Sequence, residues 1–192
     1  MYESLFQSKT DYKPQEGSML IASPQLQDVS FSRSVVYLCH HDENESVGYV
    51  VNKPSHYDLS FILKDVIRKD FPLYIGGPVD LESLHFIHNN PAINKSKKVS
   101  EHTYWSGDID QVITLINSQQ IEPHEIKFFL GYSGWGKNQL ADEIETESWL
   151  VFNPPPNLIF DTSPKLVWKK SIEHLGNRYK HFLHFPIDPI SN

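Results

Sequence analysis

Cysteine, long apolar runs and basic residues are all scarce in this sequence, and each shortage excludes something. The single cysteine, Cys39, excludes an internal disulfide. It lies in the apolar run Val35–Cys39, so we expect a buried and inert thiol. No apolar run approaches the ~20 residues that a bilayer span needs, and residues 1–18 have neither the basic nor the apolar part of a signal peptide. We therefore expect a cytoplasmic protein without a membrane partner.

Basic residues are outnumbered by acidic ones. The 17 Lys and Arg residues face 24 Asp and Glu residues, which gives a net charge of −7. Because phosphate contacts need a concentrated basic surface, direct nucleic-acid binding is not expected. The 192 residues, 39% of them hydrophobic, suit one domain with a sizeable core. We place a leader at residues 1–16 and the domain at residues 17–192.

Apolar and β-branched runs alternate with turn signals along the chain. Strands are expected at Met19–Ala22, Ser34–His40, Val47–Val51, Leu73–Ile75, Leu84–His88, Ile126–Leu130, Trp149–Phe152, Leu158–Phe160 and Phe182–Phe185. Helices are expected over Leu59–Ile67, from Asp108 onward, around Leu140–Ile144 and from Ser163 to Gly176. Strands come in pairs without strict alternation with helices. This order predicts a single compact α+β domain with mixed, largely antiparallel sheets and about four helices.

The stretch GYSGWGKNQL, from Gly131 to Leu140, admits three interpretations. It matches a phosphate-binding loop up to Lys137, but Asn138 stands where the metal-binding hydroxyl belongs. It also approaches a nucleophile elbow around Ser133, except that Trp135 replaces the last glycine. The third interpretation is a tight strand-to-helix turn whose glycines supply backbone freedom.

Four stretches together resemble the signature blocks of the bacterial YqgE/AlgH family. They are Ser23–Asp28 continuing to Val35, Gly48–Pro54, Tyr74–Val79, and Gly131–Gly136 continuing to Gln139, Leu140 and Glu143. They occur in the family's order and span most of the chain, from about Gly17 to the final helix. In this resemblance the Lys137 position is variable and Ser133 is exchangeable with Ala. Neither the phosphate-loop nor the elbow interpretation survives that comparison.

The resemblance implies a compact α+β fold but no particular reaction. One branch of the family is described as a transcriptional regulator of alginate synthesis, which implies regulation as a role. The family has no recognised DNA-binding motif. The departures here are the leader before Gly17 and a lysine-bearing loop near Asn94. They leave the partner open.

Polar residues of the first three blocks have the best claim to a common site. The candidate residues are Asp28, Arg33, Asn52, Lys53, Gly76 and Gly77. Arg and Lys beside free backbone N–H groups suit a small anion or a partner's carboxylate. A purely structural interpretation stays open, in which Asp28 and Arg33 form an ion pair, Asn52 caps a turn and Lys53 is solvated.

Other residues carry weaker signals. His85 and His88 are three apart in an expected strand and so point to opposite faces, which does not favour a metal site. Trp135 and Trp149 are expected in the core. No cofactor is expected. The leading hypothesis is a cytoplasmic domain that binds a protein or a small ligand in a regulatory role, without catalysis. The alternatives are a transcriptional regulator acting directly or indirectly on DNA, and a hydrolase or nucleotide-dependent enzyme.

Overall fold

The computed structural model describes residues 12–24, 26, 28–155 and 157–185. The strands are β1 (Met19–Ala22), β2 (Val35–His41), β3 (Ser46–Val50), β4 (Pro54–Asp58), β5 (Pro72–Ile75), β6 (Val79–His88), β7 (Lys97–Ser100), β8 (Thr103–Trp105), β9 (Ile126–Trp135) and β10 (Trp149–Phe152). The α-helices are α1 (Ile109–Asn117), α2 (Gln139–Glu145), α3 (Asn157–Phe160) and α4 (Pro164–Leu175). Short 3₁₀ helices are η2 (Val29–Phe31), η3 (Leu59–Phe61) and η4 (Asn177–His184). The expected α+β class is confirmed.

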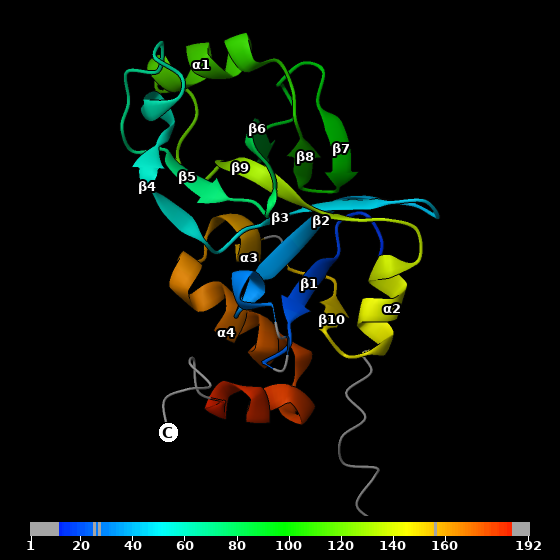
Figure 1. The fold of residues 1–192 in the computed structure, drawn as a ribbon. Helices are drawn as coiled ribbons and strands as arrows, with labels where there is room; N and C mark the ends of the chain where they lie inside the picture. Colours follow the sequence, from blue (N-terminus) through cyan, green and yellow to red (C-terminus); the bar gives the residue numbers. More distant parts are fainter. Residues whose placement is uncertain (1–11, 25, 27, 156, 186–192) are drawn as a thin grey trace, which may run out of the picture.

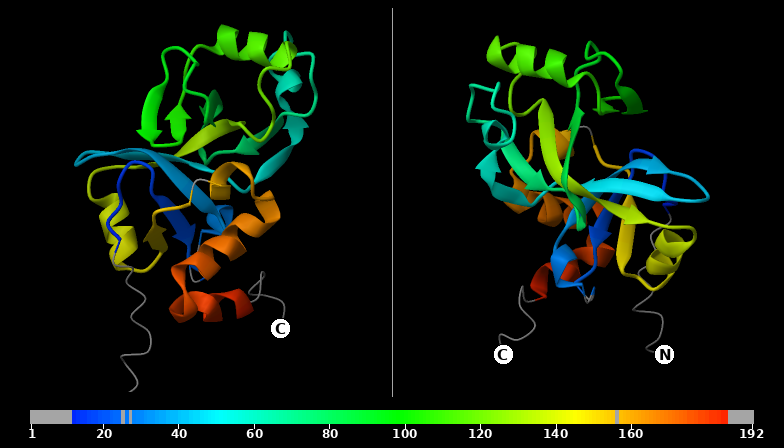
Figure 2. Two further views of the ribbon diagram at one scale, coloured as in Figure 1. Left: turned by 180° about the vertical axis from the view of Figure 1, so that it is seen from behind. Right: turned by 45° about the horizontal axis from the view of Figure 1, so that its top comes forward.

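One curled sheet runs through the molecule in the order β10-β1-β2-β3-β9-β6-β8-β7, and β5 joins it beside β9 with β4 on its outer side. Every pairing is antiparallel except that of β5 with β9. Figure 1 shows α1 above the β4–β8 part of this sheet, with α3, α4 and η4 below it. The views in Figure 2 place α2 beside β10 on another side of the lower half.

Alternation along the strands divides the apolar side chains among three cores. Odd-numbered residues of β1 and β2, such as Ile21 and Tyr37, pack with α3, α4 and η4. Even-numbered ones, such as Leu20 and Val36, pack with Trp135, Trp149 and α2. A third core lies between α1 and the strands β5, β6 and β9. Side chains point to opposite faces with a period of two, so one sheet serves helices on both sides.

The fourth signature block forms the second half of a strand and a set of hydrogen bonds that hold α2 against the sheet. β9 continues through the glycines to Trp135, so the expected turn after Leu130 is wrong. Trp135 and Trp149 are buried as expected, and both indole N–H groups donate to Glu143 Oε2 at 2.8 Å. Gln139 Nε2 donates to the other carboxylate oxygen at 2.9 Å. These hydrogen bonds fix α2 against the sheet and account for the Trp-Gln-Glu pattern.

Three other expectations are also wrong. Leu158–Phe160 lies in α3 and Phe182–Phe185 overlaps η4, so neither is a strand. The expected helix over Leu59–Ile67 is only the single turn η3, although Asp58 caps it as expected by accepting from Ser60 N at 2.9 Å. The Asn117 side chain explains the loss, because it bonds the backbone at Asp65 and Ile67. The helix that Asp108 begins is confirmed, and so is the one that begins at Pro164 and ends just before Gly176.

Two backbones approach closely where β5 ends beside β9. A Cβ added to Gly76 would lie 2.4 Å from the Gly131 carbonyl oxygen, and one at Gly77 would lie 2.2 Å from the Tyr132 carbonyl. The Gly76 carbonyl also accepts from Val50 N at 2.8 Å and from Ser133 Oγ at 3.0 Å. Only glycine permits this crossing, since backbone atoms on the far side cannot yield as a flexible side chain would.

We expect Gly76→Ala to lower the free energy of unfolding by about 3 kcal/mol, at the upper end of overpacking costs. Gly136→Ala is the matched control, because a Cβ there meets nothing within 4 Å and the residue has no positive φ. The control should change stability by less than about 0.5 kcal/mol. Urea unfolding of both variants checks this, and equal effects of the two would contradict the crossing as a packing constraint.

Candidate functional site

A cavity of about 560 Å³ opens between α4, η4 and the chain segments that flank β2 and β3. Its basic lining residues are Arg33, Lys53, Lys165, Lys169 and His184. Its remaining lining residues are Ser32, Asn52, Pro164, Trp168 and Leu183, so no Asp or Glu among the described residues lines it. The volume lies within the usual ~300–1,000 Å³ of small-ligand sites. We call this cavity the basic pocket.

Asn52 builds one wall of the basic pocket by clamping two backbone segments together. Its Oδ1 accepts from Val35 N at 2.9 Å, and its Nδ2 donates to the Arg33 carbonyl oxygen at 2.8 Å. Arg33 has a φ of 52°, a left-handed conformation that side-chain-bearing residues adopt at a cost. The amide of Asn52 holds that conformation and so directs the Arg33 side chain toward α4.

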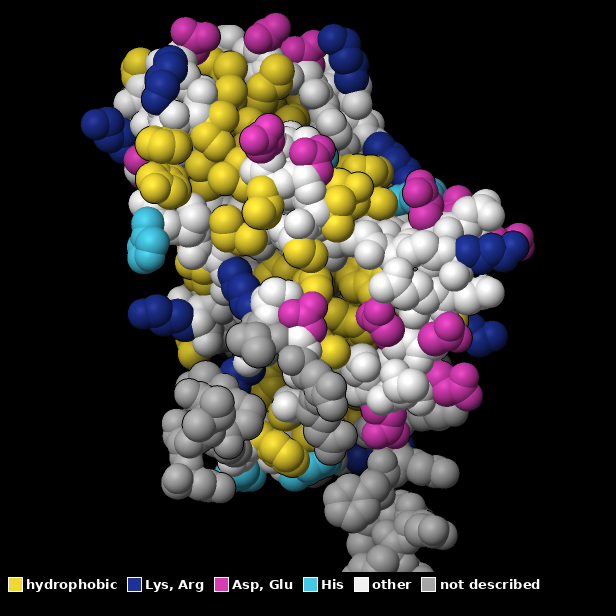
Figure 3. All heavy atoms as spheres, viewed as in Figure 1, with side chains coloured by type: hydrophobic (Ala, Val, Ile, Leu, Met, Phe, Trp, Pro, Cys, Tyr) yellow, Lys and Arg dark blue, Asp and Glu magenta, His cyan; other side chains and the backbone are white. Residues whose placement is uncertain are grey.

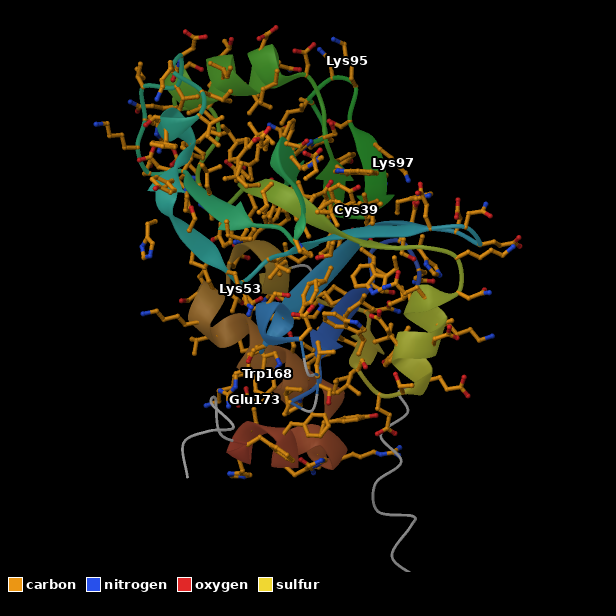
Figure 4. The ribbon with its side chains drawn as sticks, in the orientation of Figure 1. Cys39, Lys53, Lys95, Lys97, Trp168 and Glu173 are labelled. Atoms are coloured by element: carbon orange, nitrogen blue, oxygen red, sulfur yellow. The ribbon has the colours of Figure 1, made fainter. Side chains whose placement is uncertain are left out.

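Arg33 and Lys53 are each held by contacts within the protein, but each keeps N–H donors for a ligand. The Arg33 guanidinium lies 4.8 Å from the Trp168 ring centroid, and its Nη2 donates to the Phe185 carbonyl oxygen at 2.7 Å. The Lys53 amino group donates to the Ser30 carbonyl oxygen. Figure 4 shows Lys53 and Trp168 on the same side of the molecule, from the β3–β4 junction and from α4. Arg carries five N–H donors and Lys three, so both can still bind a ligand.

Burial lowers the pKa of Lys53, and the charge of Asp28 opposes that shift. Asp28 itself accepts from Ser30 N at 2.8 Å and from the Ser30 hydroxyl. No ion pair joins Asp28 to Arg33, both of which lie in the described part of the chain, so the ion pair of the purely structural interpretation is absent. Asp28 therefore shapes the loop behind Lys53 and does not line the pocket.

Helix α4 supplies the opposite wall with its positive end. Pro164 occupies the first turn, and the Ser163 side chain makes no capping hydrogen bond there. The N-terminal N–H groups of a helix favour anions, because they carry partial positive charge and lack carbonyl partners within the helix. Lys165 and Lys169 follow at i and i+4 on one face, and both are exposed. Lys169 also lies 3.8 Å from Glu173, an exposed pair that contributes little.

The structure thus brings three of the six candidate residues together: Arg33, Asn52 and Lys53. Gly76 and Gly77 lie apart from the pocket, buried against β9, so their role in the expected ligand site is not supported. Sequence reasoning missed Lys165, Lys169 and His184. The i, i+4 lysine spacing after a recognisable helix start was the available signal.

The glycine stretch does not form either catalytic motif. Residues 133–135 pair with β3, and the buried Ser133 donates its hydroxyl to the Gly76 carbonyl oxygen at 3.0 Å. Lys137 is exposed and lies outside the basic pocket. Among the described residues, no group of three or more His, Cys, Asp or Glu side chains could hold a metal ion. None of the helices in the described ranges is both long and apolar enough to cross a bilayer.

The lysine-bearing loop near Asn94 is held in place by strand pairing and by ion pairs. It includes β7, and Lys95 and Lys97 each form an ion pair, at 2.7 Å to Asp108 and 2.6 Å to Glu16. Glu16, from the end of the expected leader, is thereby tied to the domain. Residues 1–11 of that leader lie outside the described residues.

Lys127, on β9, has a pKa that burial lowers, as Lys53 does, but it lies outside the basic pocket. Its side chain is buried, and its Nζ donates to the Tyr74 hydroxyl at 3.0 Å. Burial lowers the pKa of Lys127 to about 8. Because burial disfavours the charged amine, the free-energy cost of burying Lys127 depends on pH.

The fold and the basic pocket define a single-domain protein with one mixed sheet and a concave cationic site. Residues 19–180 match the family model described as AlgH-like, and the chain belongs to that family. A "UPF0301 protein" of Parabacteroides distasonis is 37% identical over 195 residues, covering 100% of this chain and 98% of the relative. One of Chlorobium limicola is 36% identical over 169 residues, covering 88% and 90%.

Two solved structures share the fold. The solution structure of the AlgH protein of Pseudomonas aeruginosa has a TM-score of 0.71 and 26% identity, covering 88% of this chain and 93% of that one. A crystal structure of a Corynebacterium diphtheriae protein has a TM-score of 0.75 and 21% identity, covering 93% and 96%. The resemblance seen in the four sequence blocks is confirmed.

A pH titration tests the burial of Lys127. Its folded pKa of about 8 lies below the unfolded value of about 10.4. Between those values the unfolded state binds more protons, so stability rises with pH. Compared with Lys127→Met, the wild type should gain on the order of 2–3 kcal/mol in unfolding free energy by pH 10.

Urea unfolding of both proteins at pH 7.5, 8.5 and 9.5 gives the difference in their unfolding free energies. Contributions from other titrating groups are the same in both proteins and drop out of that difference. A difference that is constant with pH would mean that Lys127 titrates normally. Lys98→Met is the matched control, because it makes the same substitution at an exposed position of β7.

Proposed function

We propose that this protein is a cytoplasmic binding domain for a small anion, which occupies the basic pocket, and that it acts by occupancy without catalysis. The observation that carries the proposal is the convergence of Arg33, Lys53, Lys165 and Lys169 on one cavity, which no Asp or Glu lines in the part of the chain that the structure describes. In a chain of net charge −7, such a concentration of cations is a local exception. A regulatory role would follow if occupancy changed what the protein contacts.

The arrangement suits phosphate or carboxylate oxygens. The guanidinium of Arg33 is planar and is held against Trp168, which leaves part of its donor fork for a bidentate contact. The lysines of α4 are point charges that adapt to ligands of different size. The start of α4 adds the positive end of its dipole, although Pro164 has no N–H and Leu166 N donates to the Ser163 carbonyl oxygen at 2.8 Å.

A small ligand fits the surface better than a nucleic-acid duplex. Figure 3 shows acidic side chains gathered over the α2 side of the molecule, opposite in character to the basic side chains at lower left. The α2 segment carries Asp142, Glu143, Glu145 and Glu147. A duplex needs a long positive surface, whereas Arg33, Lys53, Lys165 and Lys169 gather at one concavity.

Pyrophosphate binding measured by calorimetry tests the proposal. The double variant Lys165→Gln/Lys169→Gln should weaken binding about 10-fold or more, because hydrogen bonds to charged groups contribute about 1.5–3 kcal/mol each. Both residues are exposed on α4, so the fold should survive. Lys137→Gln is the matched control, since it removes the lysine of the phosphate-loop pattern and should leave binding unchanged.

Several outcomes would overturn the proposal. They are no pyrophosphate binding by the wild type, equal loss in the Lys137→Gln control, and release of phosphate during the titration. A hexaglutamate peptide in a parallel titration separates the source of the anion. Tighter binding of the peptide, lost in the same double variant, would identify an acidic segment of a partner protein as the ligand. Salt-dependent binding of duplex DNA that the double variant leaves unchanged would favour the DNA-binding alternative.

A further inference from the structure

Residues 177–185, which we call the η4 segment, form one wall of the basic pocket. Leu183 and His184 line the pocket together with residues of α4 and of the chain before β2. Figure 1 shows η4 lying below α4, near the end of the described chain. The pocket is therefore complete only while the η4 segment lies against α4. We call that arrangement the closed state.

The backbone of the η4 segment has little stability of its own. It keeps 3₁₀ geometry for eight residues, whereas 3₁₀ runs longer than about four residues are uncommon because their hydrogen bonds are poorly aligned. The backbone N–H groups of Tyr179 and Phe185 donate locally, to the carbonyl oxygens of Gly176 and Phe182 at 3.1 and 3.2 Å. A segment of this kind near a chain end opens at a lower free energy than the core does.

Gly176 joins α4 to the η4 segment and provides a hinge. Its φ of 94° and ψ of −175° lie in a region that glycine adopts far more readily than other residues. A Cβ at this position would meet nothing within 4 Å, so the neighbouring atoms leave room for backbone rotation. The η4 segment can therefore swing about Gly176 while α4 stays packed against the sheet.

Buried rings and one long-range hydrogen bond hold the η4 segment closed. Tyr179 and Phe182 are 5% and 4% exposed and pack in the core with α3 and α4. Arg33 Nη2 donates to the Phe185 carbonyl oxygen at 2.7 Å, although the two residues are 152 positions apart. The same guanidinium lies against Trp168 and lines the basic pocket. Arg33 therefore contacts both the closed segment and the ligand site.

An anion in the basic pocket should hold the η4 segment closed and not displace it. Arg33 has five N–H donors, so it can bind an anion with others while it keeps the bond to Phe185. Displacement would free only one donor, and it would expose the buried rings of Tyr179 and Phe182 to water. A ligand that binds the closed state alone shifts the population toward that state.

We infer that the η4 segment is a lid, and that anion binding in the basic pocket and closure of this lid are coupled through Arg33. The inference rests on the proposed function, because it concerns the regulation of the same site. The coupling is reciprocal, so anything that holds the η4 segment open weakens anion binding by the same factor. An occupied pocket conceals Tyr179 and Phe182, which an empty pocket exposes more often. Occupancy thereby changes the surface that the protein presents to a partner.

Hydrogen–deuterium exchange of the full chain, with and without pyrophosphate, tests the inference. Without pyrophosphate, the η4 segment should exchange faster than α1, which packs in a separate core. If opening releases the ligand, exchange in the η4 segment slows about 11-fold at a free pyrophosphate concentration of about ten times Kd. The single turn η3 is the internal reference, because it lies outside the basic pocket and its exchange should not change.

Phe182→Ala weakens closure without removing a residue that lines the basic pocket. It should weaken pyrophosphate binding at least about 5-fold, because only the closed fraction binds. Phe86→Ala is the matched control, since it makes the same truncation at a side chain that is 5% exposed in the core beside α1. It should lower the stability of the domain and leave the Kd for pyrophosphate unchanged.

The outcomes separate this inference from the proposed function. No pyrophosphate binding by the wild type would overturn both. Pyrophosphate binding that leaves exchange in the η4 segment unchanged, or makes it faster, would overturn the lid alone. A Kd for Phe182→Ala equal to that of the wild type would do the same. The exchange measurement uses the wild type, so it decides the question even where Phe182→Ala does not fold.

Discussion

The close contact between the Gly76–Gly77 backbone and β9 is the constraint on which the rest of the structure depends. It lets β5 run parallel to the first half of β9 while β3 pairs with the second half. Because the Gly76 carbonyl oxygen accepts from Val50 N, the crossing also fixes where β3 ends. Asn52 and Lys53 follow at once. The contact between Gly76–Gly77 and β9 therefore positions the basic pocket. That contact lies away from the pocket and includes none of its lining residues.

Local signals in the sequence were sufficient wherever a residue acts on its own segment. The β2–β3 hairpin, the Asp108 cap, and the Pro164 start and Gly176 end of α4 were all predicted correctly, since turn and cap chemistry operates over a few residues. Prediction failed where a distant group decided the outcome. The amide of Asn117 takes up backbone groups at residues 65–67 that a helix would have used. The glycines of β9 mark a crossing, and not a turn, because of what lies on the other side of them.

The residues of the candidate site also differ in how far the sequence predicts them. Arg33, Asn52 and Lys53 belong to blocks that the family resemblance makes visible, and their convergence needs only the hairpin and the segment before it. Lys165 and Lys169 lie more than 100 residues away. Their place in the pocket depends on α4 packing against the odd-numbered face of β1 and β2, where Trp168 Nε1 donates to the Ala22 carbonyl oxygen at 3.0 Å. No local pattern encodes that contact, so sequence reasoning found one wall of the pocket and not the other.

The basic pocket also shows how an acidic protein can keep a site for anions. At physiological ionic strength the screening length is about 8 Å, so the carboxylates over α2 contribute little to the potential inside the basic pocket. The cations within it act at contact range, where Trp168 and the end of α4 exclude part of the solvent and reduce screening. Net charge then governs solubility and the repulsion of polyanions, while local geometry governs which small anion binds. Ionic strength should therefore modulate occupancy of the basic pocket.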